Sequence, residues 1–108
     1  MTIKQLNDAN FHTAIADAAL PQLIEFTAPW CVFCRRLVPA LQQLAADEQD
    51  KVQVAQVDID EAADLAERYN INVIPTRLLF KEGKHGEALV APASLPQIKQ
   101  WLNKQLPH

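Results

Sequence analysis

Short apolar runs alternate along the chain with segments whose apolar residues recur at helical spacing. The runs predict strands at Thr2–Leu6, Leu23–Phe26, Val52–Val57, Thr76–Phe80 and Glu87–Val90. The helical spacing predicts helices at residues 10–19, 31–48, Glu61–Tyr69 and from Ser94 onward. Because strands alternate with helices, the pattern predicts an α/β fold whose sheet contains parallel pairs and carries helices on both faces.

Local signals refine three of these elements. Pro39 lies inside the leucine pattern of the 31–48 helix, and its missing N–H predicts a kink there. Ser94 and Gln97, three residues apart, have the spacing of a capping box at the start of the last helix. Glu82–Gly83 predicts a turn between the last two strands.

Length and composition limit the function classes. The 108 residues, with 49% hydrophobic, suit one compact domain over 1–108 that needs no disulfide staple. The net charge of −3 and the lack of a Lys/Arg cluster argue against nucleic acid or anionic lipid as a partner. The chain shows no export signal and no apolar run of about 18 residues, so we expect a cytoplasmic protein without a membrane contact.

The chain contains two cysteines, Cys31 and Cys34, in the stretch T-A-P-W-C-V-F-C-R. A closed zinc site needs four Cys or His ligands, and none of the three histidines has ligand spacing. Covalent haem would require a histidine where Arg35 stands. A disulfide across so short a loop stabilises a fold by only about 2 kcal/mol, which disfavours a purely structural bridge. A redox pair and a metal cluster shared between two chains are left open.

The redox interpretation has a physical basis in the predicted helix. The helix begins near Cys31, so unpaired N–H groups and the positive end of the helix dipole favour its thiolate. Cys34 follows at i+3 and lies on the same helix face. One thiolate can therefore attack a substrate disulfide, and the other can resolve the mixed disulfide.

Several segments together resemble the thioredoxin family over nearly the whole chain. They are W-C-x-x-C, the acid-containing strand L-I-E-F-T-A-P-W-C, V-A-Q-V-D-I-D, Pro39, and Ile74-Pro75-Thr76 with the following Lys81-Glu82-Gly83. The resemblance implies a central mixed sheet of four to five strands flanked by about four helices. It also implies a cis bond before Pro75, packed beside the two cysteines.

The resemblance assigns expected roles to the site residues. Cys31 would attack the substrate disulfide, Cys34 would resolve the mixed disulfide, and Glu25 would be the buried proton carrier for Cys34. Substrate would be bound by the backbone of Ile74 and by the surrounding groove. The implied substrate-binding residues are Trp30, Val32, Phe33, Ile74, Pro75 and Ala91.

The dipeptide between the cysteines departs from the family pattern. Val32-Phe33 stands where Gly-Pro is usual. Phe33 restores a backbone N–H that proline would lack, and this N–H can stabilise the Cys31 thiolate. We therefore expect a better oxidant than an ordinary thioredoxin. Ala91-Pro92 replaces a groove glycine, so partner fit is also expected to differ.

A second departure concerns the buried acid. Gln56 stands where a lysine often accompanies that acid, and Arg77 stands in a strand position that is usually apolar. We hypothesise that Arg77 replaces the lysine and pairs with Glu25. Such a pair would hold Glu25 more ionised than its burial alone would allow.

These interpretations lead to one expected activity and several alternatives. The resemblance implies a monomeric thiol–disulfide oxidoreductase that reduces protein disulfides. A thioredoxin reductase-like partner would recharge it with electrons from NADPH. The chain itself has no nucleotide-binding motif, so we expect no bound cofactor beyond the Cys31–Cys34 disulfide and no metal. The alternatives are an oxidase- or isomerase-like protein, a protein-docking module, and an iron–sulfur site shared between chains.

Overall fold

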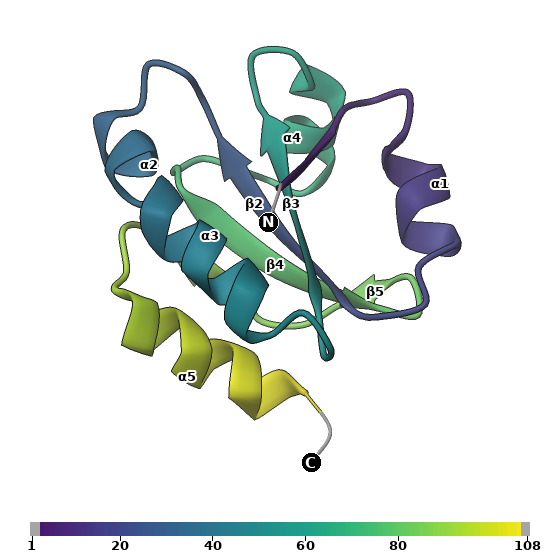
Figure 1. The fold of residues 1–108 in the computed structure, drawn as a ribbon. Helices are drawn as coiled ribbons and strands as arrows, with labels where there is room; N and C mark the ends of the chain where they lie inside the picture. Colours follow the sequence, from purple (N-terminus) through teal and green to yellow (C-terminus); the bar gives the residue numbers. More distant parts are fainter. Residues whose placement is uncertain (1–2, 107–108) are drawn as a thin grey trace.

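A computed structural model describes residues 3–106 of the chain and contains six strands and five helices in this range (Figure 1). The strands are β1 (Lys4–Leu6), β2 (Gln22–Thr27), β3 (Gln53–Asp58), β4 (Thr76–Lys81), β5 (Lys84–His85) and β6 (Leu89–Val90). The helices are α1 (Phe11–Ala16), α2 (Val32–Arg36), α3 (Val38–Asp47), α4 (Ala63–Arg68) and α5 (Leu95–Gln105).

The strands form one mixed sheet in the order β1-β3-β2-β4-β5, and β6 also pairs with β4. β3 runs parallel to both β1 and β2, whereas β4 runs antiparallel to β2. The predicted parallel pairs are therefore confirmed, and β2 lies in the middle of the sheet. The carboxyl ends of β2 and β3 lie at the same end of the sheet as the start of β4, because β4 runs antiparallel to β2.

Alternating side chains of the central strands build a separate core on each face of the sheet. On one face, Leu23 and Leu79 pack with residues of α3 and α5. On the other face, Ile24 and Leu78 pack with residues of α1 and α4. Helices therefore cover both faces, as the alternating pattern predicts, and Figure 1 shows α3 and α5 lying together over the sheet.

The prediction of one helix over residues 31–48 with a kink at Pro39 is wrong. The segment forms two helices, α2 and α3, which meet at Leu37. Pro39 lies in the first turn of α3, where a backbone N–H has no partner within the helix. Proline therefore begins the second helix and does not bend a continuous one. This break, together with the unpredicted strand β5, explains why the expected counts of strands and helices are too low.

The remaining elements match the predictions apart from their ends. The α1 and α4 helices are shorter than predicted, β3 begins one residue later, and β6 covers only the end of the predicted strand at 87–90. Thr2 of the predicted first strand lies outside the described residues. The capping box is confirmed, because Ser94 N donates to Gln97 Oε1 at 2.7 Å and Gln97 N donates to Ser94 Oγ at 3.3 Å. Glu82–Gly83 forms the predicted turn, with positive φ at both residues.

Within residues 3–106, no helix is both long and apolar enough to cross a membrane.

Candidate active site

The cysteine pair lies just beyond the carboxyl end of β2. Cys31 is the N-cap residue of α2, and it forms a disulfide with Cys34, with Cα atoms 5.2 Å apart. The Cys34 N–H donates to the Cys31 sulfur at 3.1 Å. Both residues are shielded from solvent, with 6% of Cys31 and 1% of Cys34 exposed. The first turn of a helix thus holds the pair, as the sequence spacing predicts.

The cysteines pack against the segment that precedes β4. The peptide bond between Ile74 and Pro75 is cis, as the resemblance implies. Ile74 lies in the small apolar cluster that contains both cysteines. The carbonyl of Pro75 accepts a hydrogen bond from Ala91 N at 2.9 Å, which ties the turn after β6 to this segment. The Ile74–Pro75 segment therefore packs against the disulfide and joins it to the turn at Ala91.

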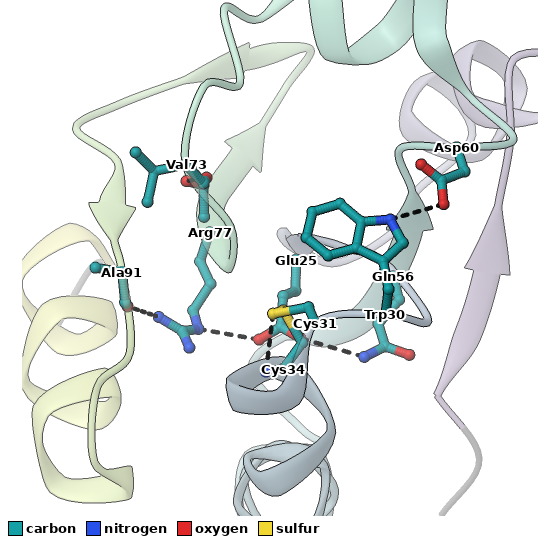
Figure 2. Close-up of a disulfide and its surroundings, with 10 residues drawn as sticks. Glu25, Trp30, Cys31, Cys34, Gln56, Asp60, Val73, Arg77 and Ala91 are labelled. Carbon is teal, nitrogen blue, oxygen red and sulfur yellow. Dashed lines mark hydrogen bonds and ion pairs between the residues drawn. A yellow bond between two sulfur atoms is a disulfide. The ribbon is translucent and has the colours of Figure 1, made fainter.

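Exposed apolar side chains surround this site. Trp30, with 63% of its surface exposed, and Phe33, with 57% exposed, flank the cysteines in the sequence. The exposed large hydrophobic residues in the described part of the chain are Trp30, Val32, Phe33, Val73 and Val90. Each lies next to the cysteines, the cis proline segment or Ala91, and Figure 2 shows Trp30 and Val73 on opposite sides of the cysteine pair. Such a gathering of exposed apolar side chains is typical of a surface that contacts another protein.

Asp60 holds the indole of Trp30, a contact that the sequence analysis missed. The Trp30 Nε1–H donates to Asp60 Oδ2 at 2.9 Å (Figure 2). The parallel pairing of β2 with β3 makes this contact possible, because parallel strands have their carboxyl ends at the same end of a sheet. Thr27 at the end of β2 is paired with Asp58 at the end of β3, so the residues that follow them are neighbours.

Glu25 is buried in the middle of the sheet and has a charged partner. Its Oε2 accepts a hydrogen bond from Arg77 Nε at 3.1 Å, and both side chains are almost completely buried. The hypothesis that Arg77 pairs with Glu25 is therefore confirmed. Gln56 Nε2 donates to the other carboxylate oxygen at 3.2 Å. Gln56 thus lies beside the acid, at the position where the sequence analysis noted that a lysine is usual, and its hydrogen bond to the acid was not predicted.

Burial sets the direction of the acid's titration. Removal from water raises the pKa of Glu25 above its ordinary value of 4.5, because desolvation disfavours the charged form. The positive charge of Arg77 and the hydrogen bonds from Gln56 and Arg77 oppose this rise without cancelling it. A carboxylate with a raised pKa is a stronger proton acceptor than an ordinary one.

The position of Glu25 brings it to the cysteine end of the molecule. Glu25 shares a sheet face with Leu23, two residues earlier, which packs with α3 and α5. The strand ends two residues after Glu25, and α2 with Cys34 leads from that end into α3. In the view of Figure 2 the carboxylate of Glu25 lies between Arg77 and the cysteine pair.

The described residues offer no alternative metal centre. Within residues 3–106, no three His, Cys, Asp or Glu side chains gather where they could hold an ion.

Comparisons with known proteins agree with this geometry. The thioredoxin family model matches residues 2–104. The chain belongs to the thioredoxin family. It is 34% identical over 100 residues to a thioredoxin of Rhodospirillum rubrum, covering 93% of this chain and 96% of that protein. It is 33% identical over 101 residues to thioredoxin 1 of Synechococcus elongatus, with 94% of each chain covered.

A chloroplastic M-type thioredoxin of Chlamydomonas reinhardtii is also 33% identical, over 94% of this chain and 72% of that protein. Family membership and the cysteine pair make the chain a thiol–disulfide oxidoreductase that acts on protein disulfides. The oxidase-like, docking and shared iron–sulfur alternatives are not favoured, because the matched relatives are thioredoxins.

Ala91 has the backbone conformation that the sequence analysis associated with a glycine. Its φ is +72°, in the left-handed region, which costs an L-residue about 1–2 kcal/mol. The side chain is half-buried in the turn between β6 and α5. The chain therefore carries local backbone strain in the turn beside the cis proline.

We expect the stability of the oxidised protein to report the titration of Glu25. The folded chain binds this proton more tightly than the unfolded chain, since the folded pKa is raised. The contribution of Glu25 is therefore complete below its ordinary value of 4.5 and is lost as the pH rises through the folded pKa. Denaturant unfolding of wild type and Glu25→Gln should give a free-energy difference that falls with rising pH. A difference that stays constant or rises would contradict the raised pKa.

We expect Ala91→Gly to stabilise the fold. Glycine removes the left-handed strain of about 1–2 kcal/mol but adds about 0.5–1 kcal/mol of entropy to the unfolded chain. The free energy of unfolding should therefore rise by about 0.5 kcal/mol. Ala40→Gly in α3 is the matched control and should lose about 1 kcal/mol. Equal losses for the two variants would show that the turn is not strained.

Proposed function

We propose that this chain reduces protein disulfides with Cys31 as the attacking thiol and Cys34 as the resolving thiol. The observation that carries the proposal is the Cys31–Cys34 disulfide at the start of α2, packed against the cis Ile74–Pro75 bond and surrounded by exposed apolar side chains. Cys31 precedes the helix, so the unpaired N–H groups of the first turn stabilise its thiolate.

In the first step the Cys31 thiolate attacks one sulfur of the substrate disulfide. A mixed disulfide forms between Cys31 and that sulfur, and the other substrate sulfur leaves as a thiolate. The flanking Trp30 and Phe33 are exposed and contact the substrate protein around the reacting bond. The backbone of Ile74 pairs with an extended substrate segment, as in the addition of a strand to a sheet edge.

In the second step Cys34 loses its proton to the Glu25 carboxylate and attacks the Cys31 sulfur. The mixed disulfide breaks, the Cys31–Cys34 disulfide forms, and the second substrate thiolate leaves and takes up a proton. Two electrons thus pass from the dithiol to the substrate. The raised pKa of Glu25 supports this role, because it makes the carboxylate a stronger proton acceptor.

We further propose that a thioredoxin reductase-like enzyme recharges the chain with electrons drawn from NADPH. We also propose that the chain acts as a monomer in the cytoplasm. A reducing compartment suits the assignment, because a cysteine pair there is more often catalytic than structural.

Trapping with cysteine variants tests the assignment of the two thiols. With a protein disulfide such as insulin, Cys34→Ser should accumulate a covalent mixed disulfide through Cys31, since nothing resolves it. Cys31→Ser should form no such adduct at neutral pH and should not reduce the substrate. Non-reducing gels and mass spectrometry identify the bond. An adduct that forms equally through Cys34 in the Cys31→Ser variant would overturn the assigned roles.

The residue before Cys34 should tune the redox potential. Phe33 lies in the first turn of α2 and, unlike proline, keeps its N–H. A hydrogen bond to a charged group contributes about 1.5–3 kcal/mol, which is about 30–60 mV for a two-electron couple. We expect a potential above thioredoxin's value of about −270 mV and a fall of that size in Phe33→Pro. Equilibration in a graded thiol–disulfide buffer measures both. An unchanged potential in Phe33→Pro would exclude the N–H as the cause.

A further inference from the structure

A row of polar side chains crosses the sheet on the face that packs with α3 and α5. Gln5, Gln56, Glu25 and Arg77 are direct partners in successive neighbouring strands, so their side chains share this face. Gln5 Nε2 donates to Gln56 Oε1 at 3.0 Å, and Gln56 Nε2 donates to Glu25 Oε1 at 3.2 Å. Arg77 Nε donates to Glu25 Oε2 at 3.1 Å. The carboxylate of Glu25 therefore has a donor on each oxygen.

Arg77 extends this row to the substrate side of the molecule. Its Nη1 donates to the carbonyl of Ala91 at 3.1 Å, in the turn that follows β6 (Figure 2). The same turn is tied to the cis proline segment through Ala91 N and the carbonyl of Pro75. One guanidinium thus contacts both the buried acid and the turn that lies beside the cysteine pair. A planar, forked cation is suited to such simultaneous contacts, whereas an ammonium group is a single point charge.

We propose that Arg77 is a positioning residue for the disulfide exchange: its guanidinium fixes the Glu25 carboxylate and the Ala91 turn in one arrangement. The proposal rests on the proposed function, in which Glu25 accepts the proton of Cys34. Arg77 itself touches neither the reacting sulfurs nor the substrate. It acts by keeping the pKa of the proton acceptor lower than burial alone would set it and by holding the wall of the substrate groove in place.

The burial of Arg77 is the physical reason for this coupling. The side chain is completely buried, and a buried charge is costly unless it is paired. Its Nη2 is buried without a hydrogen-bond partner, so its stabilising contacts are those to Glu25 and Ala91. An ionised Glu25 can accept from both Gln56 and Arg77, whereas a protonated carboxyl loses one acceptor. These contacts therefore oppose the rise in the pKa of Glu25 that burial causes, and they resist movement of the turn.

The groups that contact Glu25 determine how its titration responds to a substitution of Arg77. β4 contributes the charge of Arg77 and β3 contributes the neutral Gln56, while the two arginines of α2 are exposed. The pH dependence of resolution by Cys34 is therefore expected to follow Glu25 and its response to Arg77.

The test compares Arg77→Met and Arg77→Lys with wild type, using insulin as the disulfide substrate. In Arg77→Met, resolution of the mixed disulfide should slow about tenfold at neutral pH, because an acid without its cation keeps its proton to higher pH. The midpoint of the pH profile should move upward, and the KM should rise because the Ala91 turn is released. Lys99→Met, which removes the cation of a surface pair with Asp47, is the matched control. It should leave the resolution rate, the pH midpoint and the KM unchanged.

Arg77→Lys separates the two contacts. Its ammonium group restores a positive charge beside Glu25, so the pH midpoint should return toward that of wild type. A single ammonium cannot replace both arms of the guanidinium, so the KM should stay raised. A residue with only a structural role would lower stability without producing this split. A folded Arg77→Met variant with the wild-type pH profile and KM would overturn the proposal.

A double variant covers the case in which Arg77→Met does not fold. In Glu25→Leu/Arg77→Met both charges are removed, which is often neutral or stabilising for a buried pair. Its KM should be raised, whereas Glu25→Gln, which keeps Arg77, should retain the wild-type KM. A wild-type KM in the double variant would overturn the proposal that Arg77 holds the Ala91 turn in place. A different outcome would overturn the proposed function itself: wild type and Cys31→Ser would reduce insulin at equal rates.

Discussion

Glu25 and Arg77 place two opposite charges in the middle of a sheet in a chain of 108 residues. Leaving either charge buried and unpaired would cost about 3–5 kcal/mol, a large part of the stability of a domain of this size. The two residues are direct partners between β2 and β4, and a shift of one residue would move each side chain to the opposite face. The ion pair therefore constrains the register of the two central strands.

This register also determines the geometry of the active site. With β2 and β4 held in place, the cysteines that follow β2 meet the cis Ile74–Pro75 bond that precedes β4. The parallel pairing of β2 with β3 brings Asp60 to the indole of Trp30 at the same edge. The cysteines thus lie at the start of a helix, and the cis proline on a connection, at one end of the sheet, where many enzymes carry their chemistry.

The wrong predictions have identifiable causes. Leucine spacing continued across Leu37, so the pattern gave no sign that α2 ends and α3 begins there, and Pro39 was read as a kink inside a helix. A strand of two residues such as β5 is too short to show a hydrophobic period. The contact between Asp60 and Trp30 joins two loops and depends on the order of the strands in the sheet, which local patterns do not encode.

The sequence by itself determined the α/β alternation, the helices on both faces of the sheet and the cysteine pair at a helix start, whereas the proline segment beside the cysteines was implied by the family resemblance. The alternation of elements and the cysteine spacing are local features, because periodicity, capping and spacing follow from neighbouring residues. It also indicated that Glu25 and Arg77 were unusual, because a charge inside an apolar strand needs a partner. Only the tertiary structure decided that Arg77 donates to the carbonyl of Ala91 and that Gln56 donates a hydrogen bond to Glu25. Those contacts join three strands and a turn, and their partners are set by strand order and register in the sheet.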